Sequence, residues 1–173
     1  MPSRFTPAQL SDLDRADFIA AIGGVFEHSP WVMARAWEMR PFSSREDLDA
    51  ALVKVIREAG RDELLALIEA HPELAGKAAI RGDLTADSAR EQAGAGLNAC
   101  SPEEFELIQR LNRAYRARFG WPFIVAVKGM TRHDIIAAIE RRLPQTSTEE
   151  FVEALAQILR IAGFRLDELL TDA

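Results

Sequence analysis

"SPEEFELIQRLNRAYRARFG", residues 101–120, is the stretch that decides the fold of this chain. Ser101 suits the N-cap of a helix, Pro102 suits the first helical position, and Glu104 completes the spacing of a capping box. Apolar side chains then recur three or four positions apart, at Phe105, Ile108, Leu111 and Tyr115. This spacing predicts a helix that buries one stripe against a core.

The same helical spacing recurs along most of the chain, and it predicts further helices over residues 6–27, 43–60, 61–72, 131–144 and 147–170. Gly163 permits a bend in the last of these. Residues 121–127, "WPFIVAV", are rich in β-branched residues, but the sequence offers no second strand to pair with them. We expect them to form a buried extended connector or a short helix. The predicted architecture is all-α, with about eight helices in a single domain over residues 1–173.

The composition is that of an ordinary soluble globular protein. The 173 residues are 48% hydrophobic and 28% charged, and the net charge of −6 argues against a nucleic-acid surface. The single cysteine, Cys100, excludes an internal disulfide and a cysteine-rich zinc site. No apolar run reaches about eighteen residues, so no membrane span is predicted. Because the first residues include acidic side chains and no apolar core, we expect no signal peptide and a cytoplasmic location.

"HPELAGKAAIRGDLTADSAREQAGAGL", residues 71–97, carries the candidate chemistry. His71 stands at the end of a predicted helix, and Pro72 displaces it from helical backbone angles. Ser88, Glu91 and Gln92 follow at the spacing i, i+3, i+4, which makes them neighbours on a helix. Taken alone, this pattern leaves two interpretations open. His71 is a capping residue above a solvated polar face, or these side chains form a site.

Other catalytic classes find less support in the sequence. The metal motif HExxH is absent, and His28, His71 and His133 lie far apart, which disfavours a catalytic metal. The motifs GxSxG, GxGxxG and the phosphate-binding P-loop are also absent, so a nucleotide cofactor is unsupported. Arg165 lies within the apolar segment "IAGFRLDELL". If it is buried there, it needs a carboxylate partner or an anionic ligand.

Together these segments resemble one family, the 2-oxo-4-hydroxy-4-carboxy-5-ureidoimidazoline (OHCU) decarboxylases. The resemblance runs nearly from end to end and rests on segments in a fixed order. They are "EHSPW" at 27–31, "RPF" at 40–42, "AHPELAGKAA" at 70–79, "LTADSAREQAGAGL" at 84–97, Asn112, Tyr115, "FGWPFIVAVKG" at 119–129 and "RIAGFRL" at 160–166.

The resemblance implies an all-helical homodimer that uses no metal and no organic cofactor. It implies decarboxylation of OHCU to (S)-allantoin in urate degradation, with His71 as the acid/base and Glu91 assisting it. The substrate would be held by Pro72, Ser88, Gln92, the backbone of Phe123, Ile124 and Val125, and Arg165. Two alternatives stay open: a helical binding or scaffold protein that lacks the reaction, and an enzyme acting on a related ureido heterocycle.

Overall fold

Side-chain caps begin many of the helices in this chain. In a computed structural model that describes residues 4–171, Ser44, Ser101 and Thr131 each accept a hydrogen bond from the backbone N–H three residues later. The acidic residue at that third position accepts a bond from the N–H of the cap, so each pair forms the capping box that the sequence predicts at Ser101. The α-helices are α1 (Pro7–Asp12), α2 (Arg15–Ile22), α3 (Trp31–Trp37), α4 (Arg45–Glu58), α5 (Arg61–Glu69), α6 (Lys77–Arg81), α7 (Ala86–Gly94), α8 (Pro102–Phe119), α9 (Arg132–Arg142) and α10 (Ser147–Leu169).

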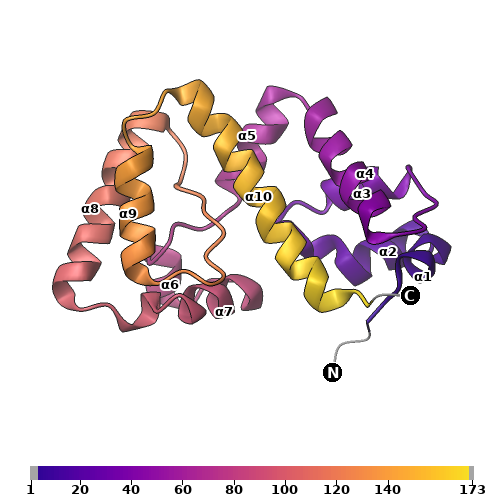
Figure 1. Cartoon of the computed structure of the whole chain (residues 1–173), viewed down its shortest axis with the longest axis horizontal. Coiled ribbons are helices and arrows are strands. Elements are labelled where there is room, and N and C mark those ends of the chain that lie inside the picture. Colours follow the sequence, from indigo (N-terminus) through magenta and orange to yellow (C-terminus); the bar gives the residue numbers. More distant parts are fainter. Residues whose placement is uncertain (1–3, 172–173) are drawn as a thin grey trace. The chain divides into compact units, whose positions relative to one another are not determined.

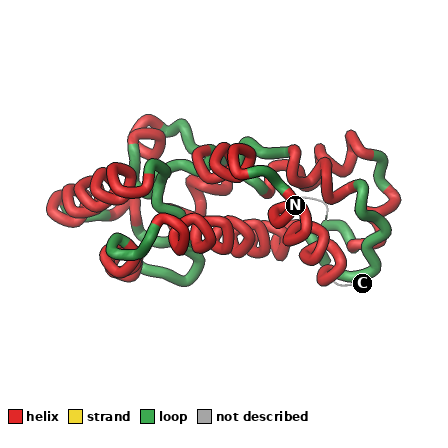
Figure 2. Tube along the Cα trace, turned by 90° about the horizontal axis from the view of Figure 1, so that it is seen from above, coloured by secondary structure: helices red, strands yellow, loops and turns green. Residues whose placement is uncertain are grey.

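The all-α prediction is confirmed for the described part of the chain. Eight of its helices have seven residues or more, and α1 and α6 are shorter. Figure 2 shows helices joined by loops, and residues 4–171 contain no strand beyond one isolated bridge between Phe5 and Leu170. Within the same residues, no helix has the length and apolar character needed to cross a membrane.

The chain forms two compact units. The first holds the described residues up to Ala70 together with those from Leu159 onward, and the second holds His71–Ile158. Because α10 runs from Ser147 to Leu169 without a break at Gly163, it contributes residues to both units. The assignment of residues 1–173 to a single domain stays a prediction.

The first unit contains α1 to α5 and the last turns of α10. Its core is built from fully buried apolar side chains, among them Leu10, Phe18, Met33, Leu48 and Leu67. The N–H of Phe5 donates to the carbonyl of Leu169 (3.0 Å), and the N–H of Thr171 donates to the carbonyl of Phe5 (3.0 Å). These two bonds hold the first described residues against the end of α10.

The single helix expected over residues 6–27 is wrong. The structure divides it into α1 and α2, followed by a short 3-10 turn at Gly23–Val25. Leu13 takes extended backbone angles, and the side chain of Asp14 caps α2 by accepting from the N–H of Asp17 (2.9 Å). An aspartate that bonds the backbone ahead of it favours a new helix start over continuation of the old helix.

The second unit is organised around α8, which lies beside α9 (Figure 1). Ile108, Leu111 and Tyr115 are buried as the apolar stripe predicts, whereas Phe105 is half-buried. Tyr115 packs against Phe119 and edge-on against Phe123, with ring centroids 4.6 and 5.2 Å apart. α8 therefore presents one face to the core of this unit and also contacts the loop segments beside it.

Glu104 joins the start of α8 to α9, and its contacts predict a pH-dependent stability. Its carboxylate accepts from the N–H of Ser101 (3.0 Å) and pairs with Arg132 and His133 of α9. The bond from Ser101 and then the pairing with Arg132 lower the pKa of Glu104 below its ordinary value. A carboxyl with a lowered folded-state pKa stabilises the fold above its unfolded-state pKa of about 4.3, and this stabilisation is lost as the pH falls through the folded-state value.

We therefore expect Glu104→Gln to lower the free energy of unfolding at pH 7 and to approach the wild type as the pH falls below about 4. Urea unfolding at a series of pH values measures this difference. A gap between the two proteins that stays constant from pH 7 to pH 3 would contradict the assignment.

Candidate active site

His71 opens the loop between α5 and α6, and its side chain is buried, with only 6% of its surface exposed. Pro72 and Glu73 are half-buried, and Leu74 and Ala75 are buried. Ala75 has a φ of 51°, a left-handed conformation that residues with a Cβ rarely adopt. The loop is therefore a tight, buried turn between two helices, and it holds His71 away from bulk solvent.

The polar triplet lies on α7, as the sequence predicts. Thr85 caps this helix by accepting from the N–H of Ser88 (3.3 Å). The side chains of Ser88 and Gln92 are buried, and that of Glu91 is half-buried. Ser88 and Gln92 therefore do not belong to a solvated polar face, whereas Glu91 remains partly accessible to solvent.

Gln92 connects α7 to the loop that follows His71. Its Oε1 accepts from the N–H of Ala75 (2.9 Å), and its Nε2 donates to the carbonyl of Glu73 (3.4 Å). Only the amide oxygen can accept from a backbone N–H, so these two bonds fix the orientation of the amide. The structure thus brings one predicted site residue onto the loop of another.

Three side chains of α8 contact the same loop, and these contacts do not follow from the sequence pattern. Asn112 Nδ2 donates to the carbonyl of Leu74 (2.9 Å), and Gln109 Nε2 donates to that of Ala75. Arg116 pairs with the carboxylate of Glu73 (2.9 Å). One available signal was an amide at position 112, four residues after buried Ile108 and therefore on the same helical face.

Residues 121–127 form an irregular buried segment, which excludes the short-helix alternative. Phe123 and Ile124 are buried, and Val125 is half-buried. The carbonyl of Ile124 accepts from Arg142 Nη1 (2.7 Å), and the N–H of Ala126 donates to Gln157 Oε1 (2.9 Å). Side chains of α9 and α10 thus supply hydrogen-bond partners to backbone groups in the segment that the sequence assigns to substrate binding.

A buried ion pair lies behind this connector. Arg142 Nε and Nη2 bond the carboxylate of Glu150 at 2.9 and 2.8 Å, and both side chains are almost completely buried. The hydroxyl of Tyr115 donates to the same carboxylate. Burial, followed by the contact with Glu150, raises the pKa of Tyr115 well above its ordinary value, so its hydroxyl stays protonated and remains a donor. The guanidinium also lies 4.4 Å from the centre of the Phe123 ring.

Arg165 belongs to the first unit, where its side chain is buried. Its Nη2 donates to Glu27 Oε1 (3.0 Å), and its Nη1 donates to the carbonyl of Val25 (3.2 Å). Glu27, which is 2% exposed, thus supplies the carboxylate partner that the sequence requires for a buried arginine. The sequence does not identify Glu27 as the partner of Arg165, because the two residues are 138 positions apart. An acidic residue within the apolar segment "VFEHSPW" was the one available indication that Glu27 is buried and paired.

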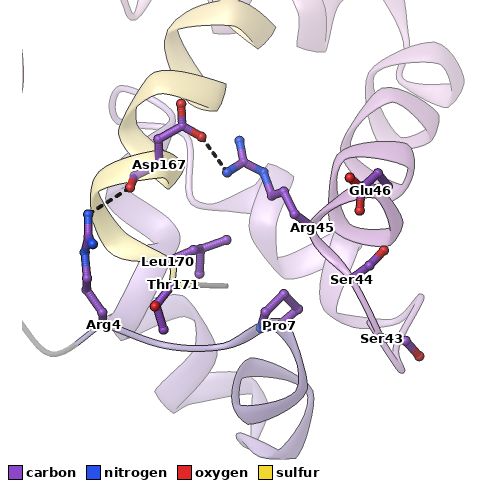
Figure 3. A pocket seen from close by; sticks show the side chains of 9 residues that line it. All are labelled: Arg4, Pro7, Ser43, Ser44, Arg45, Glu46, Asp167, Leu170 and Thr171. Carbon is purple, nitrogen blue, oxygen red and sulfur yellow. Dashed lines mark hydrogen bonds and ion pairs between the residues drawn. The ribbon is translucent and has the colours of Figure 1, made fainter. Parts of the chain in front are cut away.

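Two cavities relate differently to the predicted site residues: one is lined by none of them, and the other is lined in part by Gln92. The first, of about 540 Å³ in the first unit, is lined by Arg4, Arg45 and Asp167 among others, and by none of the predicted site residues (Figure 3). Arg45 pairs with Asp167 (2.7 Å), and Arg4 donates to the backbone carbonyl of Asp167 (3.1 Å), so protein groups already bind both cations. The second cavity, of about 570 Å³, has mostly apolar walls and is lined by Ala75 and Gln92.

No group of three or more potential metal ligands (His, Cys, Asp or Glu) comes together within residues 4–171. The buried polar residues around His71 and on α7 offer hydrogen-bond donors and acceptors that can bind and orient a small polar molecule directly. In such buried surroundings a hydrogen bond is stronger than in water.

Comparison with known proteins gives consistent results. A family model described as OHCU decarboxylase matches residues 11–167. The chain is 42% identical over 163 residues to the 2-oxo-4-hydroxy-4-carboxy-5-ureidoimidazoline decarboxylase of Haloferax volcanii, covering 94% of this chain and 95% of that protein. It is 40% identical over 168 residues to the uric acid degradation bifunctional protein of Bacillus subtilis, covering 97% of this chain and 33% of that protein. Among solved structures, a crystal structure of (S)-allantoin synthase matches with a TM-score of 0.78 and 28% identity, covering 96% of this chain and 54% of that one.

The buried ion pair predicts a non-additive pattern of stability. Arg142→Met or Glu150→Leu alone leaves one buried charge without its partner, so each should lower the free energy of unfolding by about 3–5 kcal/mol. The double variant removes both charges and should cost clearly less than the sum of the single variants. Urea unfolding of all four proteins measures the coupling. Arg141→Met, at an exposed neighbouring position, is the matched control. Additive losses would contradict the pairing.

Proposed function

Because this chain belongs to the OHCU decarboxylase family, we propose that it decarboxylates 2-oxo-4-hydroxy-4-carboxy-5-ureidoimidazoline to (S)-allantoin in urate degradation. The observation that carries the proposal is the family match over residues 11–167, within which every predicted site residue falls. The burial of His71, Ser88, Gln92 and Arg165 supports it, since buried polar side chains are costly unless they make compensating interactions.

The chemistry of the substrate explains why no organic cofactor is needed. The carboxylate and a hydroxyl share one ring carbon, and the neighbouring carbon bears the ureido group and a double bond to nitrogen. When the bond to the carboxylate breaks, CO₂ leaves and the electron pair moves toward this carbon–nitrogen bond, which gives an enol-like intermediate. The ring nitrogen of that bond, which receives the electron pair, takes up one proton. Loss of the hydroxyl proton and protonation at the ureido-bearing carbon then give allantoin, so one proton is consumed for each CO₂ released. The protein must fix the substrate orientation and the face that receives the proton.

We assign the acid/base role to His71, with Glu91 orienting its ring. Imidazole is suited to this task because it exchanges protons near neutral pH. The support is positional: His71 is buried on a constrained loop, and Glu91 is half-buried on α7 beside the two buried polar residues of the triplet. A positioned acid/base group contributes roughly a hundredfold to ten-thousandfold to the rate.

The remaining residues are assigned to binding. Ser88 and the second Nε2 hydrogen of Gln92 suit the carbonyl groups of the ureido chain and ring, and the backbone of Phe123, Ile124 and Val125 offers further hydrogen bonds. Pro72 would form an apolar wall beside His71. Arg165 would bind an anionic or carbonyl oxygen through its planar fork, oriented by the bond to Glu27. We further propose that the protein acts as a homodimer in the cytoplasm, without a metal or an organic cofactor.

Circular dichroism of freshly generated OHCU, produced in situ from urate, tests the reaction directly. With the protein present, we expect a rapid signal of (S)-allantoin, because directed protonation gives one enantiomer while the spontaneous reaction can protonate either face. Release of CO₂ is measured in parallel, since it separates decarboxylation from ring opening or isomerisation of a related ureido heterocycle. A signal no faster than the spontaneous background would reject the proposed function in favour of a binding or scaffold role.

Replacement of the acid/base residue tests the assignment of roles. His71→Ala should lower kcat roughly a hundredfold to ten-thousandfold while leaving cooperative unfolding intact. His133→Ala serves as the matched control because its side chain is exposed on α9, and it should retain the wild-type rate. A His71→Ala protein with wild-type activity would overturn the role of His71 without affecting the family assignment.

A further inference from the structure

We infer that Gln109 and Asn112 of α8 are positioning residues for His71, acting with Gln92 as an amide clamp on the backbone of Glu73, Leu74 and Ala75. The amide clamp comprises the side chains of Gln92, Gln109 and Asn112. This inference rests on the proposed role of His71 and extends it to two side chains of α8 that are not among the residues assigned to substrate binding.

The clamp supplies hydrogen bonds to consecutive backbone groups that have no helix or sheet to pair with. Its described bonds run from Gln92 to the carbonyl of Glu73, from Asn112 to that of Leu74, and from Gln109 to that of Ala75. The N–H of Ala75 donates in the opposite direction, to Gln92. Because Leu74 and Ala75 are buried, water is a poor substitute for these partners.

Ala75 shows why a loop of this kind needs the clamp. Its φ of 51° is unfavourable for a residue with a Cβ, and such a conformation persists only when the surroundings enforce it. Both the N–H and the carbonyl of Ala75 are bonded by clamp side chains from two different helices, α7 and α8. The left-handed turn is therefore held from two sides.

The backbone transmits this constraint to His71. Only Pro72 separates His71 from the first clamped residue, and its ring fixes its own φ. A residue that precedes proline is also restricted in its backbone angles. Few soft dihedral angles thus remain between the clamped turn and the imidazole, so a shift of the turn moves the ring. The ion pair of Arg116 with Glu73 acts on the same segment from the solvent side.

Gln109→Glu tests the clamp with little change of shape. The variant keeps the side chain's size but replaces the NH₂ donor with an oxygen that faces the carbonyl of Ala75. Gln109 is half-buried, so the substitution is far milder than one at buried Asn112. Arg110→Ala, at the next and exposed position of α8, is the matched control. Asn112→Ala is the second clamp variant.

Two readouts are measured on the full chain. The first is the position of the His71 ring signals in NMR spectra, which is independent of catalysis. The second is the split between kcat and KM for OHCU. In Gln109→Glu and Asn112→Ala we expect displaced His71 signals and a kcat reduced roughly tenfold or more, because misplacing a reacting group slows chemistry more than it weakens binding. Arg110→Ala should match the wild type in both.

Unchanged His71 signals and an unchanged kcat in Gln109→Glu would overturn the inference. The test of the clamp can be separated from the test of the proposed function. If the wild type fails to decarboxylate OHCU, that function is rejected, while the His71 signals still decide whether the clamp positions the ring. If Asn112→Ala does not fold, the milder Gln109→Glu variant decides alone.

Discussion

Buried backbone N–H and carbonyl groups need hydrogen-bond partners, and this requirement determines how the segments of the candidate site are fixed in place. Helices satisfy their own backbone, but residues 71–76 and the connector at 121–127 are irregular and largely buried. Several of their N–H and carbonyl groups are bonded by side chains from neighbouring helices, including Asn112 on α8 and Arg142 on α9. Two segments without regular structure thereby obtain fixed geometry, which is what a site that must orient a small substrate requires.

Each unit contains a buried arginine that is paired with a buried glutamate. Arg142 is neutralised by Glu150 in the second unit, and Arg165 by Glu27 in the first. In both pairs the guanidinium also donates to a backbone carbonyl, so the charge is compensated and the orientation of its planar fork is fixed. For Arg142 the consequence is a rigid connector. For Arg165 it is a guanidinium of fixed orientation, which would bind a substrate oxygen, as proposed above, at a smaller entropic cost than a mobile side chain.

The parts of the fold that depend on local chemistry could be predicted from the sequence. The capping box at Ser101, the stripe on α8 and the helical placement of Ser88, Glu91 and Gln92 all follow from residues a few positions apart. The division between α1 and α2 was missed because an apolar pattern continues across Asp14, and a single side-chain cap outweighs it. The partners of the loops were beyond prediction for a different reason. Asn112 meets Leu74 across 38 positions and Arg142 meets Ile124 across 18 positions, so local spacing can place an amide on a buried helical face but does not identify its partner in the loop.

Amide hydrogen exchange at Ala75 and Ala126 tests most directly whether side chains fix these irregular segments. Each N–H donates to a glutamine side-chain oxygen, from Gln92 and Gln157 respectively. If these bonds hold the segments, both amides exchange slowly, at rates close to those of the buried amides of α8. Exchange of both amides at the rate of an unprotected chain, while α8 stays protected, would contradict the account.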